Sequence, residues 1–314
     1  MSRDLYLGID MGGTQIKIAV VTPKGIIKEE TAISTDIKAK PFTILKAIVD
    51  VSVRLKSYSK IKSIGVGIAG DVDSKNGIVR FSPNLPKWKN IELKKILEKL
   101  TNKKTFVDND ANTASLGAFW LDTKGKSNNL ICITLGTGVG GGLIFNKSLY
   151  VGASGTAGEV GHITIDPYGR KCNCGNRGCI ETFVGAKYLS EYASKYFKKN
   201  RSHILDKIIN KEYPLITPHL LSKIASLGDK YAKEIWNIVG EKLGIFLSIV
   251  VNFSNPDTIV LCGGLSHAAK YFFPRLKSEV NIRAFRSASK ACKIIVSKYT
   301  HKLGVVGAAM LPKH

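Results

Sequence analysis

The chain has 314 residues, of which 44% are apolar, and its formal net charge is +23. This length suits two domains better than one, and the apolar share excludes a chain that is mainly disordered. No apolar run approaches the roughly 20 residues that a membrane span requires. Residues 1–4 lead directly into an apolar segment without a signal peptide, so we expect a cytoplasmic protein with no membrane partner.

The positive charge has two interpretations. It can mark a surface that binds a polyanion such as nucleic acid, or it can reflect a solvated surface rich in lysine. The 47 basic residues are 38 lysines and 9 arginines, and the lysines are scattered along the chain. Because arginine rather than lysine dominates specific base contacts, we predict no specific nucleic-acid partner.

The first third of the chain alternates short apolar strands with helices. Runs of β-branched residues such as 61–68 are typical of parallel strands that are buried on both faces. The alternation predicts an α/β lobe. The strands are expected at 5–10, 16–21, 25–31, 61–68 and 105–107, and the helices at 44–55, 91–100 and 111–121.

A strand, glycine turn, strand pattern occurs twice, near Asp10–Thr14 and near Thr134–Gly138. This repetition predicts two α/β lobes around a cleft, one formed by 1–120 with 300–314 and the other by 121–299, with 124–129 as the candidate hinge. The second lobe is expected to have strands at 130–135, 140–145, 258–261 and 294–296, a loop over 152–178, and helices from 186 to 253, the longest over 229–253. A final helix at 304–310 is expected to fold back onto the first lobe.

The first glycine turn is a candidate phosphate-binding site. Gly12 and Gly13 have no Cβ, so their backbone N–H groups can approach a phosphate, and Thr14 adds a hydroxyl donor. Asp10, at the end of a strand, is suited to hold Mg²⁺ through water. A plain hairpin turn is the alternative interpretation.

The second glycine turn has five glycines in the seven positions 136–142, among them Gly136 and Gly138 on either side of Thr137. Tight packing between strands is the alternative, but two such hairpins in one chain favour binding of nucleotide phosphates. Gly263 and Gly264 follow a further strand, where a base or ribose can lie against bare backbone.

His162, Cys172, Cys174 and Cys179 have the spacing of a compact metal site. Three thiolates and one imidazole match a closed tetrahedral zinc site, which is structural rather than hydrolytic. An iron–sulfur cluster and disulfides are the alternatives, but such a cluster usually takes four cysteines and a reducing compartment disfavours disulfides. The other three thiols are expected to be buried: Cys132, Cys262 and Cys292.

Several polar side chains have the setting of catalytic or binding groups. Asn109 and Asp110 lie where a strand becomes a helix. They are either N-caps of that helix, or they present the Asp110 carboxylate as a catalytic group that accepts a proton from an attacking hydroxyl. Glu159 and Glu181 flank the metal loop and lie outside any expected helix. They are either surface carboxylates or partners for the vicinal hydroxyls of a sugar.

Together these motifs resemble the ROK family of sugar kinases and related repressors. The resemblance covers essentially the whole chain, with the motifs in the family's order and spacing. It implies the actin-like ATPase fold (hexokinase-type, ribonuclease H-like), a duplicated two-lobe α/β architecture that binds ATP and sugar in a central cleft. The matching segments are 10–17, 109–112, 135–142, 158–162, 172–181 and 263–264.

The resemblance also implies roles for individual residues. Asp110 would be the base that takes the proton of the sugar's 6-hydroxyl, and His162 would bind both zinc and sugar. The implied sugar ligands are Gly70, Asn84, Asn109, Asp110, Glu159, His162 and Glu181. The implied nucleotide-binding residues are Asp10, Gly12, Gly13, Thr14, Lys17, Gly136, Thr137, Gly138, Gly263 and Gly264.

The expected activity is therefore ATP- and Mg²⁺-dependent phosphorylation of glucose at its 6-hydroxyl, by a homodimer or homotetramer. N-acetylmannosamine or N-acetylglucosamine is the alternative substrate, and polyphosphate the alternative donor. Asp71 stands where many relatives have proline, which adds a charge near the expected sugar position. A sugar-sensing regulator without turnover is the alternative of another class, although the first expected strand begins at Leu5 and leaves no room for the repressors' N-terminal DNA-binding domain.

Overall fold

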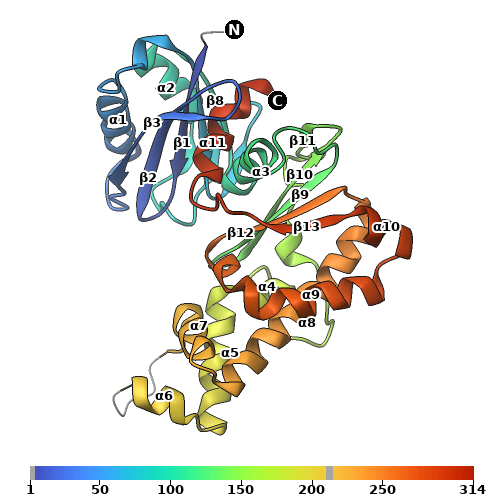
Figure 1. Cartoon of the computed structure of the whole chain (residues 1–314). Coiled ribbons are helices and arrows are strands. Elements are labelled where there is room, and N and C mark those ends of the chain that lie inside the picture. The colour runs from blue at the N-terminus through green and yellow to red at the C-terminus, as the bar shows by residue number, and fades with distance from the viewer. Residues whose placement is uncertain (1–3, 210–214) are drawn as a thin grey trace. The chain divides into compact units, whose positions relative to one another are not determined.

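The computed structural model describes residues 4–209 and 215–314 (Figure 1). These residues form two compact units. Unit 1 contains the described residues of Met1–Cys132, Gly141–Gly158 and Ser297–His314, and unit 2 contains those of Ile133–Gly140 and Glu159–Val296. The boundaries expected at 120/121 and 299/300 stay a prediction. Within the described part of the chain, no helix combines the length and the apolar character that crossing a bilayer requires.

The central sheet of unit 1 has the strand order β3-β2-β1-β4-β8. β1 and β2 form an antiparallel hairpin, whereas β1, β4 and β8 are mutually parallel, with Met11, Ile68 and Asn109 in register at one edge. The residues that follow these strands therefore gather at that edge. The strands span Leu5–Met11 (β1), Gln15–Val21 (β2), Ile27–Ser34 (β3), Ile61–Ile68 (β4) and Lys104–Asn109 (β8), which confirms the five expected strands with small shifts at their ends.

Helices cover both faces of this sheet, and alternate side chains of β1 point to opposite layers. Ile9 packs in the core shared with helices α1 and α2, whereas Tyr6 packs against Val306 of the terminal helix α11. The expected return of that helix to the first lobe is thus confirmed (Figure 1). The helices of this unit are α1 (Pro41–Ser52), α2 (Leu93–Thr101), α3 (Asp110–Leu121) and α11 (Leu303–Met310).

Helix α11 lies against the sheet so closely that glycine is required beneath it. A Cβ added at Gly65 of β4 would clash with the carbonyl oxygen of Ala308, and one at Gly8 of β1 would clash with that of Val305. Neither backbone oxygen can move without displacing the helix.

We therefore expect Gly65→Ala to lower the free energy of unfolding by about 3 kcal/mol, because an overpacked core must shift backbone to relieve the clash. Urea unfolding measures this loss. Gly264→Ala is the matched control, since a Cβ there meets nothing within 4 Å. Equal stability of the two variants would contradict the close packing of α11.

A small second sheet of unit 1 was not expected from the sequence. It has the order β5-β6-β7 and follows directly on Gly70. Strands of three or four residues are too short to show an apolar period. The strands are β5 (Asp71–Asp73), β6 (Ile78–Phe81) and β7 (Lys89–Ile91).

A further five-stranded sheet has the order β11-β10-β9-β12-β13. β10 and β11 are antiparallel, and β12 and β13 are parallel. The four strands expected here are confirmed, and the short β11 was missed. The strands span Leu130–Leu135 (β9), Val139–Phe145 (β10), Ser148–Tyr150 (β11), Thr258–Cys262 (β12) and Lys293–Val296 (β13).

Helices make up most of the rest of unit 2. The expected longest helix is confirmed as α8, with the Asp229 side chain capping it by accepting from Ala232 N at 2.8 Å. Its Trp236 packs on Phe272 of α9, with ring centroids 6.0 Å apart. The helices are α4 (Glu181–Val184), α5 (Ala186–Lys199), α6 (His203–Ile208), α7 (Pro218–Ser226), α8 (Lys230–Ser254), α9 (Ala269–Arg283) and α10 (Arg286–Ala291). Short 3-10 turns lie at Tyr58–Lys60, Val160–His162, Gly264–Ala268 and Leu311–Lys313.

Candidate functional site

Asp10 lies at the edge of the unit 1 sheet where the parallel strands end. It pairs in register with Lys17 of β2, and the start of α11 lies beside it, since a Cβ added at Gly304 would be 2.6 Å from Asp10 Oδ2. Burial raises the pKa of the Asp10 carboxyl to about 6; Lys17 opposes this shift and the negative charge of Asp110 adds to it. Asp10 and Asp110 are thus electrostatic neighbours within one unit.

This pKa gives a testable consequence for stability. The ordinary pKa of 3.8 rises to about 6 on folding, so the folded state holds the proton more tightly and ionisation of Asp10 disfavours it. The penalty is absent below about pH 4, grows between about pH 4 and pH 6, and levels off at about 3 kcal/mol above pH 6. We expect Asp10→Asn to stabilise the ligand-free protein at pH 8 more than at pH 5.

Urea unfolding at both pH values checks this expectation. Asp50→Asn, an exposed aspartate of α1, is the matched control and should change stability little at either pH. If Asp10→Asn destabilised the protein equally at pH 5 and pH 8, the Asp10 carboxylate would stabilise the fold, and its ionisation would not lower the free energy of unfolding. The expected cost of ionising Asp10 is typical of a group kept for function.

The Gly12–Gly13 turn connects β1 to β2 and is supported from outside the hairpin. Gly12 N donates to Gln15 O at 3.1 Å, and the Thr35 hydroxyl donates to Gly12 O at 2.8 Å. The Asn84 side chain lies against Gly13, where an added Cβ would be 3.2 Å from Asn84 Cβ. The predicted phosphate turn and the predicted sugar ligand Asn84 therefore adjoin each other.

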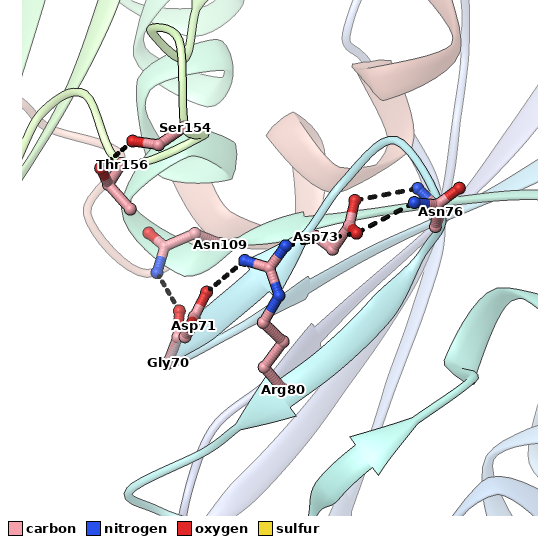
Figure 2. Close-up of polar contacts among 8 residues, drawn as sticks. All are labelled: Gly70, Asp71, Asp73, Asn76, Arg80, Asn109, Ser154 and Thr156. Carbon is pink, nitrogen blue, oxygen red and sulfur yellow. Dashed lines mark hydrogen bonds and ion pairs between the residues drawn. The ribbon is translucent and has the colours of Figure 1, made fainter.

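At the β8–α3 junction the N-cap interpretation is confirmed for Asn109, and the catalytic role of Asp110 stays a prediction. Asn109 is the N-cap of α3, because its Oδ1 accepts from Ala111 N at 2.8 Å, while its Nδ2 donates to Gly70 O at 2.9 Å (Figure 2). Asp110 is the exposed first residue of the helix, and its Oδ1 accepts from Ala111 N at 2.9 Å. The amide of Asn109 thus ties Gly70 to the junction that presents the Asp110 carboxylate.

The charge of Asp71 is offset by a residue that the sequence did not indicate. Arg80 of β6 lies 3.2 Å from Asp71 Oδ1 and 3.3 Å from Asp73 Oδ2, and Figure 2 shows its guanidinium directed at both carboxylates. Asp71 adjoins Gly70, so this ion pair flanks the contact between Gly70 and Asn109. Only the strand pairing of β5 with β6 brings Arg80 to this place.

A cavity of about 520 Å³ opens beside Lys17, and it too contains residues that the sequence did not indicate. Lys17 Nζ donates to the His301 carbonyl oxygen at 3.0 Å, and Lys302 lines the same cavity. His301 and Lys302 lie almost at the other end of the chain from Lys17. No local pattern could have joined them.

The four predicted metal ligands of unit 2 converge. Their donor atoms lie within 4.8 Å of one another; Cys172 Sγ is 3.7 Å from His162 Nδ1, and Cys174 Sγ is 3.7 Å from Cys179 Sγ. Zinc–sulfur bonds of about 2.3 Å place two sulfurs about 3.8 Å apart in a tetrahedron. All six cysteines of the chain are thiols rather than disulfides. The donor set and its spacing fit a tetrahedral zinc ion.

The chemistry of the cluster also favours a cation. Burial and the neighbouring sulfurs raise the pKa of the Cys179 thiol to about 12, whereas backbone N–H donation lowers that of Cys174. A bound metal ion would offset the repulsion between adjacent thiolates. His162 Nε2, on the far side of the ring from Cys172, lies 3.9 Å from Glu159 Oε2.

Outside the cluster, one expectation was wrong. Cys132 and Cys262 are buried as expected, but Cys292 is partly exposed. It lies between α10 and β13, at the margin of its apolar run rather than inside it.

The second glycine turn closes on itself and is held by Glu181. Gly136 N donates to Gly138 O at 3.0 Å, and Glu181 Oε2 accepts from Val139 N at 3.0 Å. Glu181 is the first residue of α4, so the expectation that it lies outside any helix was wrong; four residues are too few for a helical period. Gly263 has φ of 90° and lies against the Leu135 carbonyl, where a side chain would clash.

The predicted site residues thus form two sets, one within each unit. Unit 1 holds Asp10, Gly12, Gly13, Thr14, Lys17, Gly70, Asn84, Asn109 and Asp110. Unit 2 holds Gly136, Thr137, Gly138, Glu159, His162, Cys172, Cys174, Cys179, Glu181, Gly263 and Gly264.

Comparison with known proteins identifies the family. Residues 6–314 match the ROK family. A glucokinase of Thermotoga maritima is 31% identical over 313 residues, covering 100% of this chain and 98% of the relative. A xylose repressor of Caldicellulosiruptor bescii is 33% identical over 308 residues, covering 96% of this chain and 76% of the relative.

A solved structure agrees with these matches. The ROK family glucokinase of Streptomyces griseus, in complex with glucose and AMPPNP, superposes with a TM-score of 0.80 and is 28% identical, covering 98% of each chain. The predicted actin-like ATPase fold is confirmed. With motifs, fold and full-length relatives in agreement, the chain belongs to the ROK family.

Proposed function

We propose that this protein is an ATP- and Mg²⁺-dependent hexokinase that phosphorylates glucose at its 6-hydroxyl. The observation that carries the proposal is Asp110, an exposed carboxylate at the first position of α3 whose neighbour Asn109 is anchored to Gly70. Full-length glucokinase relatives support this choice of substrate.

In the proposed reaction the sugar's 6-oxygen attacks the γ-phosphorus of ATP. An O6–P bond forms, the bond from phosphorus to the bridging oxygen of ADP breaks, and the hydroxyl proton moves to the Asp110 carboxylate. The Ala111 N–H donates to Asp110 Oδ1 and holds the carboxylate at the start of α3. Asn109, Asn84 and Gly70 would orient the sugar in unit 1.

In unit 1 the Gly12–Thr14 turn would bind phosphate through its backbone N–H groups, with Lys17 adding positive charge, and in unit 2 the Gly136–Gly138 turn would bind phosphate in the same way. Magnesium bound to the nucleotide would neutralise charge that develops on the transferred group. The Asp10 carboxylate would accept hydrogen bonds from water bound to this ion. Structural zinc on the three cysteines and His162 would fix the loop that presents Glu159 and Glu181 to the sugar.

One rival function has a specific observation behind it. The xylose repressor relative favours a sugar-sensing regulator without turnover. Phosphorylation of an N-acetylhexosamine, or use of polyphosphate as the donor, would follow the same mechanism with one substrate replaced. We also propose a cytoplasmic homodimer or homotetramer without a specific nucleic-acid partner, in line with the sequence predictions.

Release of ADP by the purified protein with Mg-ATP tests the proposal. We expect release with D-glucose that exceeds release with N-acetylmannosamine, N-acetylglucosamine or no sugar. Release with an acetamido sugar alone would change the assigned substrate to that sugar and leave the proposed mechanism unchanged. Binding of a sugar without release of ADP from ATP, and without formation of sugar phosphate from polyphosphate, would support the regulator instead.

We expect metal analysis of the purified protein to find about one zinc per chain, because the cluster offers one set of four tetrahedral donors. Inductively coupled plasma mass spectrometry measures the stoichiometry. Protein that is folded and active with far less than one zinc per chain would contradict the assignment. Iron together with inorganic sulfide would indicate a cluster instead.

A further inference from the structure

Glu181 connects the metal cluster to the glycine turn of unit 2 within three residues. It follows the ligand Cys179 with only Ile180 between them, and its Oε2 accepts from Val139 N at 3.0 Å. Gly138 leaves room for this contact, since a Cβ there would clash with Glu181 Oε2. The carboxylate therefore occupies the place that a side chain at Gly138 would fill.

The backbone around Glu181 holds the same turn from a second side. Ala186 N donates to Gly136 O at 3.0 Å, and Gly185 N donates to Glu181 O at 2.8 Å. A Cβ added at Gly185 would be 3.1 Å from Thr137 O. The segment from Glu181 to Ala186 thus contacts the turn at Gly136, Gly138 and Val139.

On the side of the metal cluster the segment is equally fixed. Ile180 N donates to Ile163 O at 2.9 Å, and Cys179 O accepts from Thr182 N at 2.9 Å and from the Thr182 hydroxyl at 2.8 Å. Cys179, Ile180 and Thr182 are all buried. A displacement of Cys179 would therefore be passed to Glu181 rather than absorbed by a flexible link.

We propose that Glu181 is a positioning residue for the phosphate turn at Gly136–Gly138, and that the metal cluster sets the shape of this turn through Cys179. The inference rests on the proposed function, in which this turn binds nucleotide phosphates. It adds to the sugar contact that the family resemblance implies, because one carboxylate oxygen is already engaged by Val139 N–H. Loss of the metal or of Glu181 then weakens the binding of the nucleotide as well as the binding of the sugar.

Two substitutions separate the hydrogen bond from the charge. Glu181→Gln keeps a carbonyl oxygen that can accept from Val139 N–H and removes a negative charge near the phosphates. Glu181→Ala removes the acceptor. Glu234→Ala is the matched control, since Glu234 is an exposed glutamate of α8 in the same unit and lies outside the predicted site.

Calorimetric binding of AMPPNP and hydrogen exchange of the peptides that cover 136–142, both with the full-length zinc-loaded chain, test the proposal. Loss of a hydrogen bond to a charged group corresponds to about a tenfold change in Kd or more. We expect Glu181→Ala to raise the nucleotide Kd about tenfold and to speed exchange in 136–142. Glu181→Gln should keep the wild-type Kd or lower it, with exchange unchanged, and Glu234→Ala should alter neither.

Removing zinc with a chelator should speed exchange in 136–142 as Glu181→Ala does. If Glu181→Ala left Kd and exchange unchanged, or if Glu181→Gln and Glu234→Ala weakened nucleotide binding as much as Glu181→Ala does, the positioning role would be overturned. Unchanged exchange after zinc removal would overturn the link to the metal. If no variant bound nucleotide but exchange still rose in Glu181→Ala alone, the positioning role would stand and the proposed function would fail.

Discussion

Asp110→Asn should lower kcat for glucose phosphorylation by about 10³-fold and leave the Kd for glucose nearly unchanged. A general base contributes about 10² to 10⁴ in rate, and asparagine cannot take the proton of the sugar hydroxyl. Its side-chain oxygen can still accept from Ala111 N–H, as Asp110 Oδ1 does at 2.9 Å, so the start of α3 should be preserved. The defect should therefore appear in turnover and not in folding.

Single-turnover kinetics and equilibrium glucose binding measure the two quantities separately. Asp50→Asn, which removes an exposed carboxylate from α1 of the same unit, should keep the wild-type rate. An Asp110→Asn enzyme with near-normal kcat would show that Asp110 is not the general base. A variant that lost glucose binding in proportion to its rate would assign Asp110 to substrate binding instead.

Cys174→Ser should abolish zinc binding and destabilise unit 2. A neutral hydroxyl replaces a thiolate in a set whose donor atoms lie within 4.8 Å of one another, and the remaining buried thiols would lose their counterion. We expect the zinc content to fall from about one per chain to near zero, with a loss of about 3 kcal/mol or more in the free energy of unfolding. Glucose binding should fall with it.

Metal analysis and urea unfolding measure these effects in the same samples. Cys292→Ser is the matched control, because Cys292 lies outside the cluster and is only partly exposed. A Cys174→Ser protein that kept stoichiometric zinc and wild-type stability would show that Cys174, the exposed member of the set, is not a ligand.

The fold was predictable wherever apolar periodicity extends over a whole element. The strands of the two five-stranded sheets and the long helix α8 follow from runs of this kind, and only the three-residue β11 escaped. The sheet of β5, β6 and β7 did not follow, because its strands are short and its position depends on pairing across turns. The short helix α4 was missed for the same reason, and with it the helical position of Glu181.

The site shows a similar division between local and distant signals. The metal cluster could be predicted because its ligands fall within 18 residues and carry distinctive chemistry. Lys17 contacts a backbone atom of His301, and Glu181 contacts the backbone N of Val139. Both partners are backbone atoms far along the chain, so the types of the residues could not predict these contacts. Arg80 was missed because an arginine on a surface strand is unremarkable until its partners Asp71 and Asp73 are known.

Phosphorus NMR of the product formed from Mg-ATP and D-glucose identifies the oxygen that receives the phosphoryl group. We expect a new phosphomonoester signal that is split by the two protons on C6, no such signal with 6-deoxyglucose, and a signal that appears about 10³-fold more slowly with the Asp110→Asn enzyme. A phosphomonoester at another carbon would contradict the assigned acceptor. Absence of any sugar phosphate from folded, zinc-loaded protein that binds glucose, with ATP or polyphosphate as donor, would contradict the kinase assignment itself.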